Sequence, residues 1–456
     1  MPCLVITFIS RKEMSCFESP FEWSIREELI QDLLEALLHK TSHDENNIPF
    51  VNLSRYVLLT YGYTVKPDYD KVRKYIEITN EIWNSNKKKL QQEGVSVDAV
   101  NSIIQATEYR SLTIMKNELG NVEDEIVVPQ DFQTLESDAR ATLNGLKSVV
   151  FCVLESYDTA INYAKKAVSE NPNCPLWHFI LGTNLQKVRR KHSLRSLPSH
   201  EELDSFLVAY NMSNNNSDYG FYLLRTHSDN NNKELAHSIA KEMQQKYPEN
   251  NLLQLKLARH FIIYNLLNDA KISLDMMEKS GDDSNFFMYT MGLYYSKIKE
   301  CEMALIYFKK GTEDHFRCSL RYALCMKYVD KDFSLLYHLF LMLKKFEQKA
   351  YQQEILIYIG IEYYHRCQYE KAMKFCVRAI KINPNLALLK DFVHRTYNYV
   401  NKFNVYNFID EALLTRLKKV GREYSVEEDV LEYENIRKTL SMTSTPETDS
   451  TLDYGE

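Results

Sequence analysis

The sequence predicts an all-α protein of about eight stacked helix–turn–helix units with capping helices. Three observations support this fold class. Five consecutive 34-residue windows begin at position 217 and follow one another without an insertion. Small residues recur at fixed places in these windows. The 456 residues include only 12 Gly and 11 Pro, which is low for a β-rich protein with many tight turns. Because one such hairpin cannot bury its apolar face alone, units of this period stack into a superhelical solenoid.

The repeat is clearest in the window that begins at position 353. Its markers, at window positions 4, 7, 8, 11, 17, 20, 27 and 32, are Leu356, Ile359, Gly360, Tyr363, Tyr369, Ala372, Ala379 and Pro384. Earlier windows have Ala304, Ala270 and Ala236 in the place of Ala372, and Gly292 stands in the place of Gly360. Small side chains where two helices cross let them approach to about 8–10 Å. This pattern resembles the tetratricopeptide repeat.

The remaining segments predict parts that flank or interrupt this array. In chain order they are a lead and capping helix at 1–50; a divergent repeat, long helix and acidic connector at 51–130; the repeat array at 131–400 with a basic insertion at 189–199; capping helices at 401–440; and a disordered, acidic, Ser/Thr-rich tail at 441–456. After Pro384, a helix from Leu386 to about Val400 is expected in the next first-helix slot. The window from Ser319 is degenerate, because His338 replaces the repeated alanine.

Composition excludes several classes of function. A net charge of −6 argues against a chain that attracts nucleic acid over its whole surface. The nine Cys contain no CxxC pair, which favours free thiols in a reducing compartment and a cytoplasmic location. No apolar run reaches membrane-span length, and no secretion signal is evident. No phosphate-binding glycine loop, catalytic grouping, metal motif or cofactor motif is present, so we expect a non-enzymatic protein.

The inward positions of the first helices carry cations with aromatic residues one turn away. The candidate groove residues are Lys187, Arg225, Arg259, Lys297 and Lys327, with Phe179, Phe221 and Tyr289. This pairing suits single-stranded RNA, through phosphates and stacked bases, and it suits an acidic peptide equally well. A charged repeat surface without a ligand is a third reading, since acidic residues such as Asp229 interrupt the row. The leading hypothesis is an interaction scaffold that holds an extended protein segment, and RNA is the alternative.

The basic insertion is a second candidate. A lip of Arg189, Arg190, Lys191 and Arg195 could contact phosphates, although such a run is commonly a solvated loop. The carboxylate clamp by which some repeat proteins hold chaperone tails needs Lys and Asn at set inward positions. Because Gly145, Val149, Phe221 and Leu255 stand there, that mode of peptide binding is disfavoured.

Beyond the repeat, the order of parts resembles the interferon-induced proteins with tetratricopeptide repeats. A divergent repeat at 56–76, a long helix and an acidic connector precede a well-formed second helix from Tyr157 to Pro172. The segment 171–177 then resembles the family's Asn-Pro-x-x-Pro-x-aromatic turn, and a helix ending near Lys187 leads into the insertion. The resemblance implies a coil that binds RNA 5′ ends in innate defence, with phosphate contacts at Lys187 and at the position of Arg259. Leu252 and Leu255 replace the family's Tyr and Arg there, which argues against a specific triphosphate contact.

Overall fold

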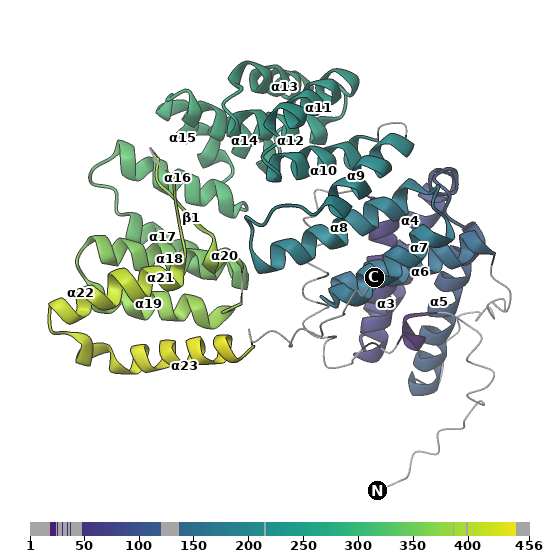
Figure 1. Ribbon diagram of the computed structural model, residues 1–456, viewed down its shortest axis with the longest axis horizontal. Helices are drawn as coiled ribbons and strands as arrows, with labels where there is room; N and C mark the ends of the chain where they lie inside the picture. Colours follow the sequence, from purple (N-terminus) through teal and green to yellow (C-terminus); the bar gives the residue numbers. More distant parts are fainter. Residues whose placement is uncertain are drawn as a thin grey trace, which may run out of the picture. The chain divides into compact units, whose positions relative to one another are not determined.

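Consecutive helices pair along the described chain (Figure 1). The computed structural model describes residues 19–23, 25, 30, 34, 37, 48–119, 136–213, 216–385, 387–397 and 400–443. Its contacts divide it into two units, each described here by itself. Unit 1 comprises Met1–Arg189 and Leu197–Met243, and unit 2 comprises Arg190–Ser196 and Gln244–Glu456.

Unit 1 contains the divergent repeat and the first regular repeats. Its elements are η1 (Pro20–Glu22), α3 (Pro49–Val65), α4 (Tyr69–Gln92), α5 (Val97–Leu119), α6 (Ser137–Val153), α7 (Tyr157–Glu170), α8 (Pro175–His192), α9 (His200–Met212), α10 (Ser217–Asp229) and α11 (Lys233–Lys246). The last residues of α8 and α11 are assigned to unit 2. The pairs α3/α4 and α6/α7 pack as antiparallel hairpins, and α5 contacts α3, α4 and α6.

Unit 2 continues the array and ends in shorter elements. They are α12 (Asn251–Ile263), α13 (Leu267–Ser280), α14 (Asn285–Lys297), α15 (Cys301–Lys310), α16 (Phe316–Val329), α17 (Leu335–Lys345), α18 (Lys349–His365), α19 (Tyr369–Ile382), α20 (Ala387–Lys390), β1 (Phe392–Arg395), β2 (Val400–Phe403), α21 (Val405–Asn407), the π-helix η3 (Phe408–Leu413), α22 (Leu414–Lys419), η4 (Glu423–Val426) and α23 (Glu427–Thr443). The predicted all-α repeat fold class is confirmed, with one small hairpin added.

The predicted 34-residue period sets where the second helices begin. Helices α11, α13, α15, α17 and α19 start at Lys233, Leu267, Cys301, Leu335 and Tyr369, which are separated by a constant 34-residue step. The repeated alanines at 236, 270, 304 and 372 are all fully buried. A methyl group is the largest side chain that such a close helix crossing tolerates, so spacing and residue type together determine the hairpin geometry.

A left-handed residue ends the first helix in most of these repeats. Asn231, Asn265, Lys299 and Cys367 have φ of 58°, 62°, 67° and 57°, and they too lie in the 34-residue frame. The following N–H donates to the carbonyl five residues earlier, which satisfies a group left open at the helix end. The degenerate window departs from this pattern, because Asp330, which follows the last residue of α16, is in extended conformation. The turn therefore differs where the sequence repeat is weakest.

Gly292 marks the closest approach within the α14/α15 hairpin. A Cβ built on Gly292 would lie 2.4 Å from Cε1 of Phe308, a distance that real Cβ atoms do not show. Phe308 is buried in the cluster that also contains Ala304 and Tyr289. A glycine at this position is therefore required by the aromatic ring that faces it.

Changing Gly292→Ala should destabilise the protein by about 1–3 kcal/mol through overpacking. That cost exceeds the gain of up to about 1 kcal/mol from better helix propensity. Urea unfolding followed by circular dichroism measures the difference. In a Phe308→Leu background the ring is gone, so the added methyl group should cost much less. An equal cost in both backgrounds would contradict the steric explanation.

The prediction of a helix from Leu386 to about Val400 is wrong. The chain forms the short α20 and then the antiparallel hairpin β1/β2, in which Phe392 pairs with Phe403. This segment is rich in aromatic and β-branched residues, which favour extended structure. Phe392 is fully buried in the core of unit 2, and the Arg395 N–H donates to the Tyr358 hydroxyl at 3.0 Å. These tertiary contacts outweigh the repeat frame.

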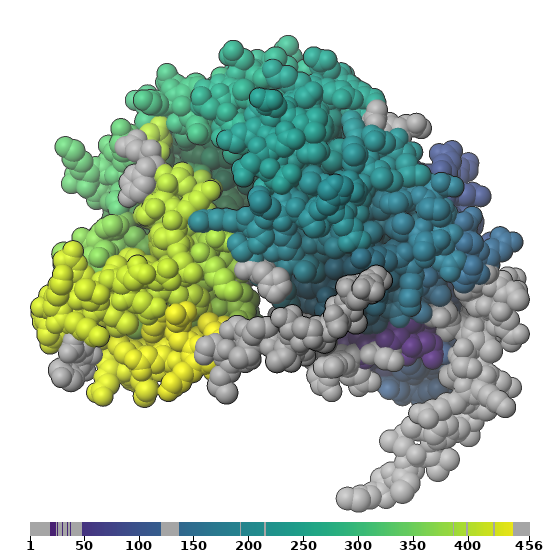
Figure 2. Space-filling view, in the orientation of Figure 1, coloured from purple at the N-terminus to yellow at the C-terminus, as the bar shows by residue number. Residues whose placement is uncertain are grey.

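The remaining predictions concern the segments near the ends of the chain and the acidic connector. Within the predicted lead and capping helix at 1–50, the described Ile30, Leu34 and Leu37 are helical and buried. Most of this segment lies outside the described residues. The acidic connector and the tail from residue 444 also lie outside them. Helix α23 packs on α19, and in Figure 2 its surface (yellow) is open to solvent. No helix in the described part of the chain is long and apolar enough to cross a membrane.

Candidate functional site

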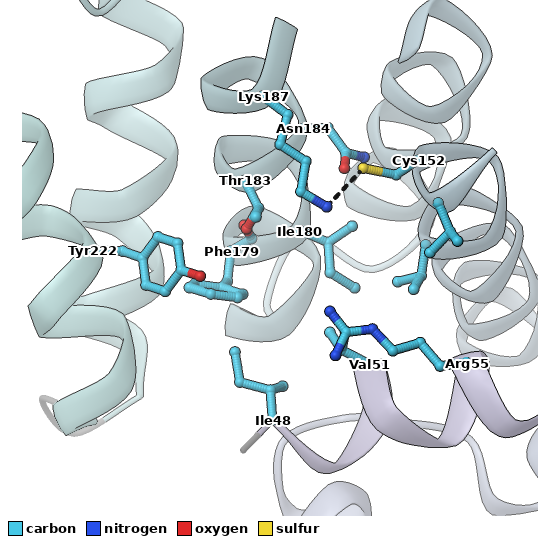
Figure 3. A pocket seen from close by; sticks show the side chains of 12 residues that line it. Ile48, Val51, Arg55, Cys152, Phe179, Ile180, Thr183, Asn184, Lys187 and Tyr222 are labelled. Carbon is cyan, nitrogen blue, oxygen red and sulfur yellow. Dashed lines mark hydrogen bonds between the residues drawn. The ribbon is translucent and has the colours of Figure 1, made fainter. Parts of the chain in front are cut away.

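Helices α3, α6, α8 and α10 of unit 1 enclose a cavity of about 210 Å³ (Figure 3). Residues from all four helices reach it, and α8 contributes the most. The lining residues are Ile48, Val51, Arg55, Val149, Cys152, Val153, Phe179, Ile180, Thr183, Asn184, Lys187 and Tyr222. Phe179, Thr183 and Lys187 follow one another at the i, i+4, i+8 spacing of a single helix face, which is why one helix supplies so much of the wall.

Two cations reach this cavity from different helices. The Lys187 ammonium group donates a hydrogen bond to the Cys152 thiol, with Nζ 3.1 Å from Sγ. The Arg55 side chain enters from α3 and is only 7% exposed, and its Nη1 lies 3.2 Å from Asn52 Oδ1. Figure 3 shows both charged groups directed into the same space. None of the described residues that line the cavity is acidic, so its walls carry two cations among neutral polar and apolar side chains.

Aromatic side chains form the opposite wall. The buried Phe179 ring stacks on Tyr219 with centroids 4.6 Å apart, and it meets Tyr222 edge to face at 4.9 Å. The Tyr219 hydroxyl in turn donates to the Glu93 carboxylate at 3.2 Å, where burial raises the pKa of Glu93. These contacts hold Phe179 in one orientation. The cavity therefore combines fixed apolar surface with two cations, an arrangement that can bind an anion attached to a flat or apolar group.

Sequence reasoning found part of this site and missed the rest. Lys187 and Phe179 were predicted and both line the cavity. Phe221 and Arg225, also predicted, lie on α10 but are not among its lining residues. Arg55 was not predicted, because it lies at the third position of a divergent repeat, which is not one of the inward positions where the candidate residues recur. Tyr222, at the sixth position of its window, was missed for the same reason.

The other predicted groove residues belong to unit 2. The Arg259 guanidinium carbon lies 5.7 Å from the ring centroid of the buried Tyr289. Lys327 forms an ion pair with Glu362, with Nζ 2.5 Å from Oε1, so a carboxylate of the same unit already compensates its charge. Lys297 is exposed at the end of α14. The structure thus brings Arg259 and Tyr289 together, whereas Lys327 is engaged with a neighbouring acid.

Arg189, predicted either as part of a phosphate-contacting lip or as part of a solvated loop, is buried and ion-paired in the structure. Helix α8 continues to His192, and the Arg189 side chain is only 7% exposed. Its guanidinium group pairs with Glu202 at 2.9 Å and Asp229 at 2.8 Å. Burial by itself would lower the pKa of Arg189, but hydrogen bonds to these two carboxylates raise it. Sequence reasoning could not know that an acid from α9 faces this arginine.

The rest of the predicted lip lies in unit 2. Arg190 is half-buried and Lys191 is exposed, both in the last turn of α8. Asp391 accepts hydrogen bonds from the Ser193 hydroxyl at 2.7 Å and from the Leu194 N–H at 2.8 Å. It also pairs with Arg195, whose Nε lies 3.0 Å from Oδ1. Residues 193–195 are therefore held within unit 2 through Asp391.

Comparisons with known proteins agree with this architecture. The family described as Tetratricopeptide repeat matches residues 353–386. The sequence has no significant match among curated proteins. A structure of a human IFIT1 dimer with PPP-AAAA is 13% identical, covers 95% of this chain and 99% of that chain, and has a TM-score of 0.51. A structure of a monomeric IFIT1 mutant with Gppp-AAAA is 12% identical, covers 95% of this chain and 99% of that chain, and has a TM-score of 0.50. The structure of yeast Tom70 is 12% identical, covers 92% of this chain and 95% of that chain, and has a TM-score of 0.45.

The family match concerns one window of the chain, and the similarity to solved structures concerns its fold. The matched residues 353–386 contain the window that the sequence shows best, and they fold as α18 and α19. The similarity to IFIT1 covers nearly all of both chains and concerns the fold alone. The chain therefore contains a tetratricopeptide repeat at residues 353–386, and its fold is distantly similar to that of human IFIT1.

Proposed function

We propose that the protein is a non-enzymatic binding scaffold whose unit 1 cavity holds the 5′ end of a single-stranded RNA. One observation carries this proposal. Lys187 and Arg55 reach the same small cavity beside the Phe179 wall, and no described lining residue is acidic. Desolvated cations attract an anion more strongly than solvated ones, because the surrounding dielectric constant is lower. A terminal phosphate meets the cations while its nucleoside contacts the aromatic and aliphatic walls.

The size of the cavity favours the end of a chain over its middle. Pockets that bury whole small ligands usually measure about 300–1,000 Å³, and this one measures about 210 Å³. It can therefore enclose a terminal group, while the remainder of the ligand stays outside. The human IFIT1 structure with PPP-AAAA shows that a protein of similar fold holds a short RNA with a 5′-triphosphate. That similarity supports the choice of ligand to test.

The leading prediction from the sequence, an extended protein segment in the groove, stays a prediction. A peptide carrying a carboxylate would meet the same two cations, so charge alone does not separate the two ligands. The ligands differ in their salt dependence. RNA affinity falls with a slope in log K against log salt of about −0.7 for each phosphate neutralised on a single strand.

Changing Lys187→Gln should weaken binding of PPP-AAAA about tenfold or more, since a charge-assisted hydrogen bond contributes about 1.5–3 kcal/mol. The salt slope should also fall by about 0.7, because one phosphate contact is lost. Fluorescence anisotropy with labelled RNA at several salt concentrations measures both quantities. AAAA with a 5′-hydroxyl group should bind wild type more weakly and should lose little on substitution.

The matched control is Lys116→Gln, which removes an exposed lysine of α5 that does not line the cavity. If the two substitutions weakened RNA binding equally, the affinity for RNA would depend only on the overall charge of the protein. Absence of RNA binding at low salt, together with saturable binding of an acidic peptide that depends on Lys187, would replace RNA by protein as the ligand.

A further inference from the structure

Two free cysteines of unit 2 meet where α15 packs on α16. Cys301 is the first residue of α15, and Cys325 lies on α16. The Cys325 sulfur lies 4.0 Å from the Cys301 carbonyl oxygen, so it contacts the main chain of the other cysteine itself. This contact is compatible with a disulfide, in which the two Cα atoms are usually about 4.4–6.8 Å apart. The packing of the two helices therefore places a second thiol beside Cys301.

The Cys301 side chain is held by a tyrosine from a distant part of unit 2. Its thiol donates a hydrogen bond to the Tyr397 hydroxyl, with Sγ 2.8 Å from Oη. Tyr397 follows β1 and stacks on Tyr328 of α16, with ring centroids 4.5 Å apart. Burial, and then the hydrogen bond with Cys301, raises the pKa of Tyr397, so its hydroxyl stays protonated at neutral pH. Tyr397 therefore fixes the Cys301 side chain in one rotamer.

The two thiols differ in their access to solvent. Cys301 is half-buried, whereas Cys325 is only 1% exposed. Burial raises the pKa of Cys325 to about 12, and its interaction with Cys301 acts in the same direction. A buried, protonated thiol reacts slowly with an oxidant in solution, because the thiolate is the nucleophile. Cys301 is therefore the thiol that an oxidant meets first, and Cys325 is placed to react with it afterwards.

We propose that Cys301 and Cys325 form a modification site at which hydrogen peroxide produces an intramolecular disulfide. The Cys301 sulfur first attacks one peroxide oxygen. An S–O bond forms, the O–O bond breaks, and the products are a sulfenic acid and water. The Cys325 sulfur then attacks the Cys301 sulfur, so that an S–S bond forms, the S–O bond breaks, and the hydroxide leaves as water with the thiol proton. Each sulfur loses one electron overall, and the peroxide is reduced to two waters.

Oxidation at this site releases Tyr397 from its partner. In the disulfide the Cys301 sulfur carries no proton, so it cannot donate a hydrogen bond to the Tyr397 hydroxyl. Tyr397 and Tyr328 line a second cavity of about 220 Å³, next to the ion pair of Lys327 and Glu362. The disulfide therefore frees one wall of this cavity. The site lies in unit 2 and is independent of the unit 1 cavity, so either proposal can fail alone.

The test treats the folded full chain with hydrogen peroxide, blocks the remaining thiols with iodoacetamide and maps tryptic peptides without reduction. Trypsin releases Cys301, Cys318 and Cys325 in separate peptides, at residues 300–309, 318–321 and 322–327. We expect peptides 300–309 and 322–327 to be linked, and dithiothreitol should separate them. Cys325→Ser should abolish the link and leave a sulfenic acid on Cys301 that dimedone traps. Cys301→Ser should also abolish the link and should leave Cys325 unoxidised.

Two further variants test the surroundings of the thiol pair. Tyr397→Phe keeps the ring but removes the hydroxyl, so the link should form faster, because the Cys301 side chain has no hydrogen bond to give up. The matched control is Cys367→Ser, which removes an exposed cysteine from the turn after α18 and should leave the yield unchanged. Links from Cys301 to Cys318 or Cys367 as abundant as the link to Cys325 would overturn the proposal, since they indicate unfolded chains. A sulfinic acid on Cys301 without any link would overturn it too.

Discussion

Changing Arg189→Leu should destabilise the protein by about 3–5 kcal/mol, because it leaves the Glu202 carboxylate charged and buried. Glu202 is 1% exposed, and in the described part of the chain Arg189 is its ion-pair partner. Asp229 loses the same partner but is more exposed, so it contributes less. The midpoint of urea unfolding at neutral pH, followed by circular dichroism, measures this loss.

Two further variants separate buried charge from lost packing. Arg189→Leu combined with Glu202→Leu should recover much of the stability, since a buried ion pair can often be replaced by apolar residues. Arg195→Leu is the matched control, because Arg195 is also ion-paired but its side chain is 50% exposed. It should cost about 0–1 kcal/mol. A double variant no more stable than Arg189→Leu would rule out the buried charge as the cause.

Changing Trp177→Ala should also cost about 3–5 kcal/mol, since it empties the centre of the α3, α6 and α8 packing. Trp177 is fully buried and meets Phe50 edge to face, with centroids 5.2 Å apart. Its six-membered ring lies against Gly145, where a Cβ would be 2.3 Å from Cζ3. Trp177 and Phe179 lie on the same turn of α8, so loss of the indole should loosen the cavity wall as well. Urea unfolding and PPP-AAAA affinity measure the two effects.

Trp177→Phe distinguishes the ring from the indole nitrogen. In the described structure the buried Nε1 has no hydrogen-bond partner, so replacing it should not forfeit a hydrogen bond. We expect Trp177→Phe to cost clearly less than Trp177→Ala. Gly145→Ala should cost about 1–3 kcal/mol in wild type and less in the Trp177→Phe background, where the facing ring is smaller. Additive costs for Gly145→Ala and Trp177→Phe would show that the two side chains do not compete for space.

The sequence predicted the candidate site only where the site follows the repeat frame. Lys187 and Phe179 are two helical turns apart on α8, so a single inward face accounts for both. Arg55 enters from a repeat whose frame is weak and which lies far earlier in the chain. Repeat positions indicate which way a side chain faces, but they do not state which other helix it meets. That meeting depends on how the helices pack.

The sequence by itself determined the repeat fold. The second helices at 34-residue intervals, the buried alanines and the left-handed turn residues all follow from local spacing, because each hairpin imposes the same steric requirements. Only the tertiary structure decided which charged side chains are buried in ion pairs and which can still contact a ligand. It pairs Arg189 with Glu202, and it replaces an expected helix by a hairpin in which the Arg395 N–H donates to the Tyr358 hydroxyl. Burial and pairing arise between residues distant in sequence, so no local period can encode them.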